Sequence, residues 1–338
     1  MRLMDEGAVA PVSASPGRPL RVVAAGGGTG LPRVLSGLAD RAGSEDGRAL
    51  DLTAVVTTAD DGGSSGALRR AFGVPAAGDV RNCLVALAGE GSPLAAVFQH
   101  RFAGDDPALA GHTVGNLVLT ALAQRLGDFS RAVDAAAELL GVRGRVLPAS
   151  EGPVDLEARL ADGRVVRGES RIARAGGRVA ELRLARPATA PLEAIEAVLH
   201  ADVVVLGPGS LYSSVLASLV ARGLPEALRA TAATRVAVVN LFTQPGETDG
   251  YAAADHVRAL RAHLGDVVDV ALVHGGPLPG PLLAAHAAEG ATPVEVDRAE
   301  LEALGVVPMV EDLLAAGAVA RHDPQKLARA LLAIARAR

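Results

Sequence analysis

Short runs rich in β-branched residues alternate with Ala- and Leu-rich stretches along the chain from Arg21 onward. Near-continuous apolar strands that alternate with helices are typical of a parallel sheet covered by helices on both faces. This pattern therefore predicts an α/β fold with a mainly parallel sheet. The expected strands are Arg21–Ala25, Leu52–Thr58, Asp202–Leu206, Arg235–Asn240 and Val267–His274. The expected helices include Leu31–Ala42, Asn116–Leu126, Ser130–Leu140, Leu211–Ala221 and a closing helix over Pro324–Arg338.

Residues 142–186 depart from this pattern. They show the two-residue alternation of half-buried strands in three segments, Val154–Leu160, Val165–Ser170 and Val179–Leu184, which are separated by Gly-containing turn signals. We expect a small antiparallel β excursion within a single α/β domain that spans residues 20–338. Residues 1–19 hold no continuous apolar run and are expected to form a disordered tail.

The composition excludes several classes of function. One cysteine, Cys83, among 338 residues excludes a disulfide framework and a cysteine-rich zinc site. A formal net charge of −5 and the scarcity of aromatic residues (2%) argue against nucleic acid as a partner. The single lysine, Lys326, does not follow a glycine, which excludes a Walker A loop. No stretch reaches the roughly 18 apolar residues of a membrane span, and the N-terminus lacks the apolar centre of a signal peptide, so we expect a cytoplasmic protein without a membrane partner.

Two glycine-rich loops, Gly26–Gly30 and Gly207–Ser210, each follow an expected strand and precede an expected helix. Glycines let the backbone approach a ligand closely, and a helix start offers free N–H groups to a phosphate. The first loop does not fit the strict dinucleotide fingerprint, so it predicts a phosphate or nucleotide ligand more strongly than NAD; a plain strand–helix turn is the structural alternative. The candidate binding residues are Gly27, Gly28, Thr29, Gly30, Gly207, Gly209 and Ser210.

A third loop carries paired carboxylates and hydroxyls after the strand Leu52–Thr58. Asp60 and Asp61 are candidates to hold magnesium or ribose hydroxyls, and the following residues to bind an anion; a helix cap with surface acids is the structural alternative. The loop also contains G-x-S-x-G, which makes Ser64 a formal hydrolase nucleophile, although a hydrolase elbow normally follows its strand directly. The candidates are Asp60, Asp61, Gly62, Gly63, Ser64 and Ser65, with Asp60 and Asp61 as the metal ligands.

Further polar residues lie in the segments Gly78–Cys83, Gly111–Asn116, Gly207–Ser214 and Phe242–Tyr251. Arg81 is expected to pair with a phosphate or with Asp79, and His112 is either a general base or a structural histidine at a helix start. The only two tyrosines, Tyr212 and Tyr251, fall in loops after strands, which favours stacking or hydroxyl bonding to a ligand. Candidate ligand contacts from these segments are Asp79, Arg81, Asn82, His112, Asn116, Tyr212 and Thr243.

Six motifs occur in order along the chain: GGGTGL at Gly26–Leu31, ADDGGSSG at Ala59–Gly66, GDVRNCL at Gly78–Leu84, GHTVGNL at Gly111–Leu117, GPGSLYSS at Gly207–Ser214 and NLFTQPGETDGYAAADH at Asn240–His256. Together they resemble the bacterial gluconeogenesis-factor family, relatives of 2-phospho-L-lactate transferase. The resemblance implies a three-layer, Rossmann-like fold and a UDP sugar as ligand, notably UDP-N-acetylglucosamine. It also implies a role in carbon partitioning, cell shape and peptidoglycan precursor supply during gluconeogenic growth.

The TQPGETDGY segment resembles the gluconeogenesis-factor branch more than the transferase branch, whose members use magnesium to join a phospholactyl group to a deazaflavin. His286 departs from the family, which often has Tyr there, whereas Arg321 in the late RHD segment is retained and would supply positive charge. The expected function is therefore a UDP-sugar-binding regulator, with no certain cofactor and a homodimer as the expected oligomer. A magnesium-dependent transferase and a serine hydrolase using Ser64 are the alternatives.

Overall fold

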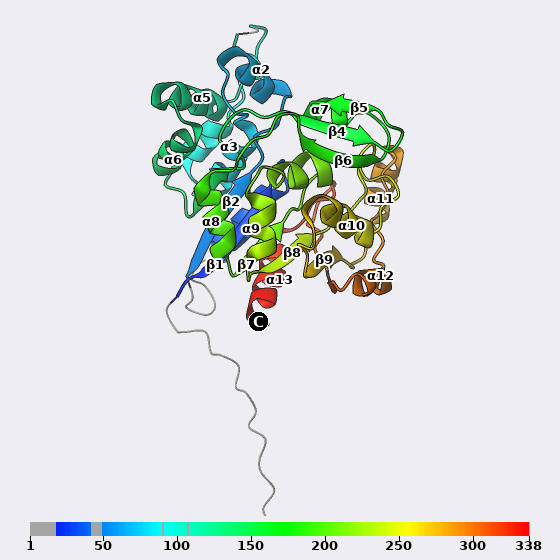
Figure 1. Ribbon diagram of the computed structural model, residues 1–338. Helices are drawn as coiled ribbons and strands as arrows, with labels where there is room; N and C mark the ends of the chain where they lie inside the picture. The colour runs from blue at the N-terminus through cyan, green and yellow to red at the C-terminus, as the bar shows by residue number, and fades with distance from the viewer. Residues whose placement is uncertain (1–17, 42–48, 90, 107, 338) are drawn as a thin grey trace, which may run out of the picture.

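The computed structural model describes residues 18–41, 49–89, 91–106 and 108–337, and a sheet of seven strands runs through its centre (Figure 1). The strand order is β10-β9-β8-β7-β1-β2-β3, and every pairing is parallel. Because the chain builds outward from β1 in one direction and from β7 in the other, the topological switch point lies between these two strands. The strands are β1 (Leu20–Gly26), β2 (Leu50–Val56), β3 (Arg145–Pro148), β7 (Val203–Leu206), β8 (Thr234–Val238), β9 (Val270–His274) and β10 (Val307–Glu311).

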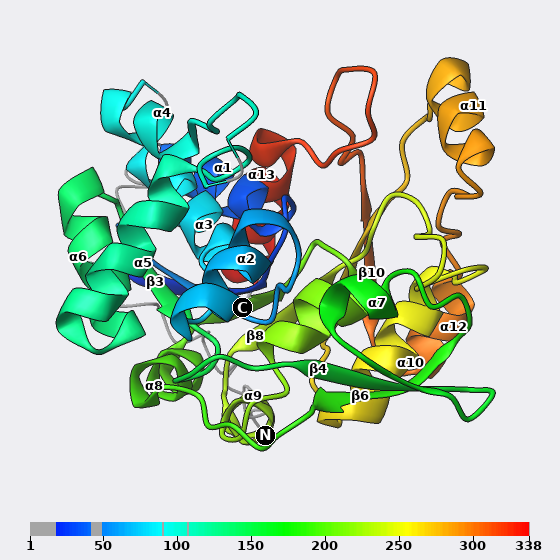
Figure 2. The same ribbon diagram turned by 90° about the horizontal axis from the view of Figure 1, so that it is seen from above.

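Helices cover both faces of the sheet, which confirms the three-layer α/β fold; Figure 2 shows α1, α3 and α13 on one side and α8, α9 and α10 on the other. Successive side chains of a strand point to opposite faces, so Val22 and Ala24 pack in one apolar core whereas Val23 and Ala25 pack in the other. The helices of the N-terminal half are α1 (Leu31–Arg41), α2 (Gly63–Phe72), α3 (Gly78–Ala88), α4 (Pro93–Gln99), α5 (Val114–Leu126) and α6 (Phe129–Leu140). Those of the C-terminal half are α8 (Leu192–His200), α9 (Leu224–Ala230), α10 (Ala253–Leu264), α11 (Gly280–Ala288), α12 (Arg298–Ala303) and α13 (Pro324–Arg336).

The antiparallel excursion is present but shorter than residues 142–186. It consists of β4 (Leu156–Leu160), β5 (Val165–Arg167) and β6 (Val179–Leu184) in the order β5-β4-β6, with the short helix α7 (Glu169–Ile172) after β5. Residues 145–148, which the sequence placed in the excursion, instead form β3 and pair with β2 at the edge of the main sheet. A four-residue strand offers too few positions for its periodicity to distinguish the two sheets.

Two further segments differ from the sequence-based expectation. The expected helix Leu211–Ala221 is a wide turn, η1 (Leu211–Val215), followed by a 3₁₀ turn, η2 (Leu216–Ser218). The Ser210 carbonyl accepts hydrogen bonds from both Ser214 and Val215 N–H groups, which widens the first turn beyond α-helical pitch. The strand β10 was not expected, because Pro308 has no backbone N–H to donate to a neighbouring strand. Proline is tolerated here because β10 lies at the edge of the sheet.

Of the expected tail, residues 1–17 lie outside the described residues. Among the helices that the structure describes, none combines the length and the apolar character required to cross a bilayer.

Candidate functional site

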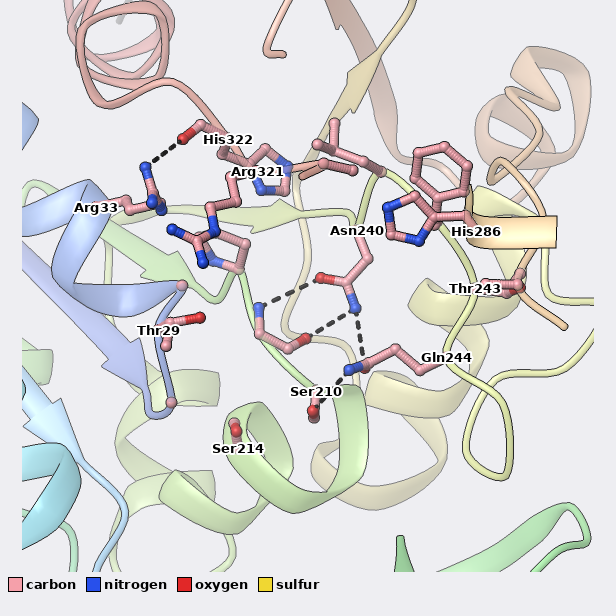
Figure 3. Close-up of a pocket in the computed structure, with 18 of the residues that line it drawn as sticks. Thr29, Arg33, Ser210, Ser214, Asn240, Thr243, Gln244, His286, Arg321 and His322 are labelled. Carbon is pink, nitrogen blue, oxygen red and sulfur yellow. Dashed lines mark hydrogen bonds between the residues drawn. The ribbon is translucent and has the colours of Figure 1, made fainter. Parts of the chain in front are cut away.

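A cleft of about 460 Å³ opens at the switch point, between the loops that follow β1 and β7 (Figure 3). In an open parallel sheet this is the place where the strand ends diverge and a ligand has room to bind. The cleft gathers residues that are distant in the sequence, and several of them were predicted from the sequence. The predicted residues that line it are Gly28, Thr29, Gly30, Gly209, Ser210, Thr243 and Arg321.

The loop after β1 brings backbone to the cleft. Gly28 has φ of 62°, in the left-handed region that glycine adopts without strain. A Cβ atom at Gly30 would collide with the carbonyl oxygen of Pro208, so the two glycine loops touch backbone to backbone. Helix α1 begins directly afterwards, with Arg33 N–H bonded to the Gly30 carbonyl at 3.0 Å. Because Pro32 has no N–H and the Arg33 N–H is already bonded, the backbone N–H groups that this loop offers to an anionic ligand are those before Pro32.

Amide side chains fix the loop after β7. Asn240 accepts a hydrogen bond from Gly209 N–H at 3.3 Å and donates Nδ2 to the Gly209 carbonyl at 2.9 Å. Gln244 Nε2 donates to Ser210 Oγ at 2.9 Å (Figure 3). Neither amide was predicted as a site residue, although Asn240 is the last residue of the predicted strand Arg235–Asn240. The loop is thus held in place by side chains from the next strand end.

Two arginines bring positive charge to the cleft. Arg33, in the first turn of α1, donates to the backbone carbonyl of His322 at 3.3 Å, and Arg321 lies beside it in Figure 3. Burial lowers the pKa of Arg33, and the charge of Arg321 lowers it further. His322 is buried, donates Nε2 to the Val239 carbonyl at 3.2 Å, and has its pKa lowered to about 4 by burial. The histidine is therefore neutral at pH 7, and the arginines supply the charge.

An aromatic pair lines the same cleft. The rings of Phe242 and His286 stack with their centroids 4.1 Å apart and an interplanar angle of 22°. His286 comes from α11, and Phe242 follows β8, so the pair joins two elements across the cleft. A flat ring surface of this kind is what a planar base requires for stacking.

Three carboxylates gather beside the cleft residues, at the carboxyl end of β2. Asp60, Asp61 and Glu169 place one oxygen each within 4.8 Å of one another. Burial raises the pKa of Glu169 to about 7, with a further contribution from the charges of Asp60 and Asp61. Crowded carboxylate oxygens are ligands that Mg²⁺ prefers, and a divalent cation would relieve their repulsion, so this set fits a magnesium ion. The sequence predicted the two aspartates but missed Glu169, because α7 belongs to the excursion.

Asp79 connects this cluster to the first glycine loop. A Cβ atom at Gly27 would lie 2.5 Å from Asp79 Oδ2, so only glycine lets the loop pass the carboxylate. Burial raises the pKa of Asp79 to about 6, a hydrogen bond from the backbone of Gly28 opposes the rise, and the charge of Asp60 adds to it. Asp79 therefore couples the acidic cluster electrostatically to the cleft.

The other predicted polar residues form a buried network. Ser64 Oγ lies 2.9 Å from His112 Nδ1 and accepts a hydrogen bond from Asn116 Nδ2 at 3.1 Å. Arg81 donates to Asn116 Oδ1 and Asn82 Oδ1, both at 2.8 Å, so it holds neighbouring side chains. The network also includes Thr113, which accepts from Arg81 at 2.5 Å. Near it, Gly62 and Gly63 open α2, and Ser65 lies against Gly78.

Tyr212 and Gly207 lie away from the cleft, contrary to expectation. Tyr212 is only 1% exposed, and its hydroxyl lies 2.9 Å from that of Tyr251. The two hydroxyls satisfy each other within the apolar core, so neither ring presents itself to a ligand in the cleft. Gly207 lies against Val215 and Val238, behind the residues that line the cleft.

Comparison with known proteins agrees with the six motifs. The family model for 2-phospho-L-lactate transferase CofD matches residues 22–314. A protein named gluconeogenesis factor from Halalkalibacterium halodurans is 45% identical over 314 residues, covering 92% of this chain and 95% of that protein. The Bacillus subtilis protein of the same name is 41% identical over 320 residues, covering 94% and 98%.

A crystal structure of a UPF0052-family protein from Bacillus halodurans superposes with a TM-score of 0.88 at 42% identity, covering 93% of this chain and 99% of that one. Its similarity extends the agreement from sequence to fold. The chain therefore belongs to the 2-phospho-L-lactate transferase CofD family, in the branch of the gluconeogenesis factors.

Proposed function

We propose that the cleft at the switch point binds a UDP sugar of the UDP-N-acetylglucosamine type, and that the protein acts as a ligand-binding regulator in the cytoplasm. The observation that carries the proposal is the convergence of two glycine loops, two arginines and a ring pair on one cleft. The backbone of Gly28–Gly30 and the hydroxyl of Ser210 would hold the diphosphate. Arg33 and Arg321 would balance its charge, and the Phe242–His286 pair would support the base.

Calorimetry with UDP-N-acetylglucosamine tests the proposal. Arg321 is the best residue to change, because its side chain is exposed and forms no hydrogen bond with other described residues that the substitution would remove. A charge-assisted hydrogen bond is worth about 1.5–3 kcal/mol, so Arg321→Ala should weaken binding by about tenfold or more. Arg329→Ala, an exposed arginine on α13, is the matched control and should bind like the parent protein. The proposal fails if the parent protein shows no binding at millimolar ligand.

The name gluconeogenesis factor, carried by relatives that match more than nine-tenths of this chain, supports a role in gluconeogenic growth. We propose that ligand occupancy reports cell-wall precursor supply and links it to carbon flux and cell shape. A deletion strain of a host that requires such a factor on gluconeogenic carbon sources provides the test. The parent gene should restore growth and cell shape, and the Arg321→Ala gene should restore them only at raised UDP-N-acetylglucosamine levels.

The acidic cluster favours a second candidate, a magnesium-dependent transferase acting on a nucleotide diphosphate. Asp60, Asp61 and Glu169 would hold the ion, which when bound supplies charge neutralisation to phosphoryl oxygens. Magnesium-dependent release of UDP from a UDP-sugar panel, lost in Asp61→Asn and kept in the exposed-surface control Asp105→Asn, would establish this activity. Absence of product across the panel would leave the regulator as the function.

A further inference from the structure

A second and larger cleft, of about 1040 Å³, lies between α2, α7 and the loops that flank the excursion. Its described lining residues include Arg69, Arg70, Arg167, Arg171 and Arg186, but only three carboxylate residues. These arginines converge from α2, β5, α7 and the segment after β6. In a chain whose net charge is −5, such a concentration of guanidinium groups in one concave site is a feature that the proposed nucleotide cleft does not explain.

The arginines of this cleft differ in how far they are already neutralised. Arg69 pairs with Asp155 at 2.5 Å, and Arg167 pairs with Glu157 at 2.5 Å. Arg70 donates to the backbone carbonyl of Asp61 at 3.2 Å and forms no ion pair with a carboxylate of the described residues.

Arg171 and Arg186 complete the set. Both side chains are exposed, and within the described ranges neither guanidinium has an ion pair or hydrogen bond. Three guanidinium charges therefore remain available to a ligand in the cleft.

The uncharged part of the lining narrows the ligand class. None of the described residues that line the second cleft is aromatic, in contrast to the Phe242–His286 pair of the first. A nucleobase would find no ring to stack on here. Planar guanidinium groups match phosphate oxygens in a bidentate manner, and the cleft has the volume that small-molecule sites require.

The short helix α7 sets this cleft beside the acidic cluster. Glu169 joins Asp60 and Asp61, whereas Arg171, two residues later, lines the arginine cleft. The Ser170 N–H donates to Asp61 Oδ1 at 2.9 Å and ties α7 to the loop after β2. Figure 2 shows α2 and α7 at the end of the sheet where the strands terminate. The excursion therefore supplies charges of both signs at this end of the molecule.

We propose that the arginine cleft is a second ligand site, which binds a phosphorylated, non-aromatic small molecule through Arg70, Arg171 and Arg186. The site is separate from the nucleotide cleft, and its existence does not depend on the identity of the ligand there. It gives the β excursion a binding role in addition to its structural one.

Inorganic pyrophosphate, without magnesium, is the probe. Titrations start from the Arg321→Ala variant, so that binding in the first cleft does not mask binding in the second. Adding Arg171→Ala and Arg186→Ala should weaken pyrophosphate binding at least tenfold, whereas adding the control Arg329→Ala should leave it unchanged. The milder Arg186→Gln should give a smaller loss in the same direction, and a thermal melt of each variant checks that it is folded.

Three outcomes would overturn the proposal. One is the absence of pyrophosphate binding at millimolar concentration, and another is equal affinity in the arginine variants and the control. The third is an acidic peptide of six glutamates that binds more tightly than pyrophosphate with the same arginine dependence, because the site would then take a peptide. UDP-N-acetylglucosamine binding by Arg171→Ala/Arg186→Ala in the parent background should be unchanged, so failure here and failure of the proposed function are distinguishable.

Discussion

Replacing Glu169 by glutamine should stabilise the protein at pH 8 and leave its stability almost unchanged below pH 4.5. The carboxylate of Glu169 is partly buried and faces Asp60 and Asp61, which together raise its pKa to about 7. A carboxyl group whose pKa is higher in the folded than in the unfolded protein binds its proton more tightly when folded. Stability is therefore highest where the group is protonated in both states, and it falls as the pH rises from 4.5 to about 7.

The size of the effect follows from the same pKa. At about 1.36 kcal/mol per pKa unit, a rise from 4.5 to about 7 corresponds to about 3.4 kcal/mol for a fully buried group. Because Glu169 is only partly buried, solvent screening reduces the expected gain to about 1–2 kcal/mol. Glutamine keeps the shape of the side chain and cannot ionise, so the gain in the free energy of unfolding measures the effect of the Glu169 charge alone.

Urea unfolding at pH 4, 6 and 8 measures the effect, with the exposed helix residue Glu138 changed to glutamine as the matched control. Millimolar Mg²⁺ at pH 8 should stabilise the parent protein and not Glu169→Gln, because a cation that binds the cluster stabilises the folded state by mass action. A stability difference that is the same at all three pH values would refute the argument from charge crowding. A variant that Mg²⁺ stabilises as much as the parent would remove Glu169 from the ion site.

Three further outcomes follow from the geometry. Gly30→Ala should abolish UDP-N-acetylglucosamine binding in calorimetry, because its Cβ meets the facing backbone, whereas Gly280→Ala, which has open space, should bind normally; equal binding would contradict the close contact. Tyr212→Phe should lower the free energy of unfolding by about 1 kcal/mol through loss of the bond to Tyr251 and leave ligand binding unchanged; weakened binding would place the ring in the site after all. A fluorophosphonate probe should not label Ser64, because the His112 ring beside Ser64 has no carboxylate partner among the described residues. Labelling that Ser64→Ala abolishes would restore the hydrolase alternative.

Local patterns predicted the order of the fold well, because buried parallel strands and the helices between them leave strong periodic signals. The strands β1, β2, β7, β8 and β9 appear near the positions expected, and so do α1, α5, α6 and α13. Short or edge elements carry weaker signals. The strand β3 has four residues, and β10 contains a proline, so tertiary pairing and not local preference decides their conformation.

The residues of the candidate site also differ in how far local sequence patterns predicted them. Glycine loops at strand ends were predictable because a parallel sheet brings these ends to one edge. Contacts that depend on long-range packing were not predictable: Glu169 approaches Asp61 across more than a hundred residues of sequence, and Asn240 reaches Gly209 from the loop after β8. Tyr212 and Tyr251, in contrast, were predicted as ligand contacts but lie outside the cleft. Their loop positions favoured stacking or hydroxyl bonding to a ligand, but both rings are buried, against β6 and α10.

The placement of opposite charges would make the proposed ion binding and the proposed nucleotide binding depend on each other. A diphosphate beside Gly28 would lie near Asp79, whose pKa already responds to the charge of Asp60. Without a cation, the acidic cluster would repel such a ligand, and a divalent cation held by the cluster would offset most of that negative charge. Because linkage is reciprocal, a cation that tightens UDP-sugar binding must itself bind more tightly when the sugar nucleotide is present. The same diphosphate would relieve the mutual repulsion of Arg33 and Arg321, so these arginines and the cation would favour binding of the ligand in the same direction.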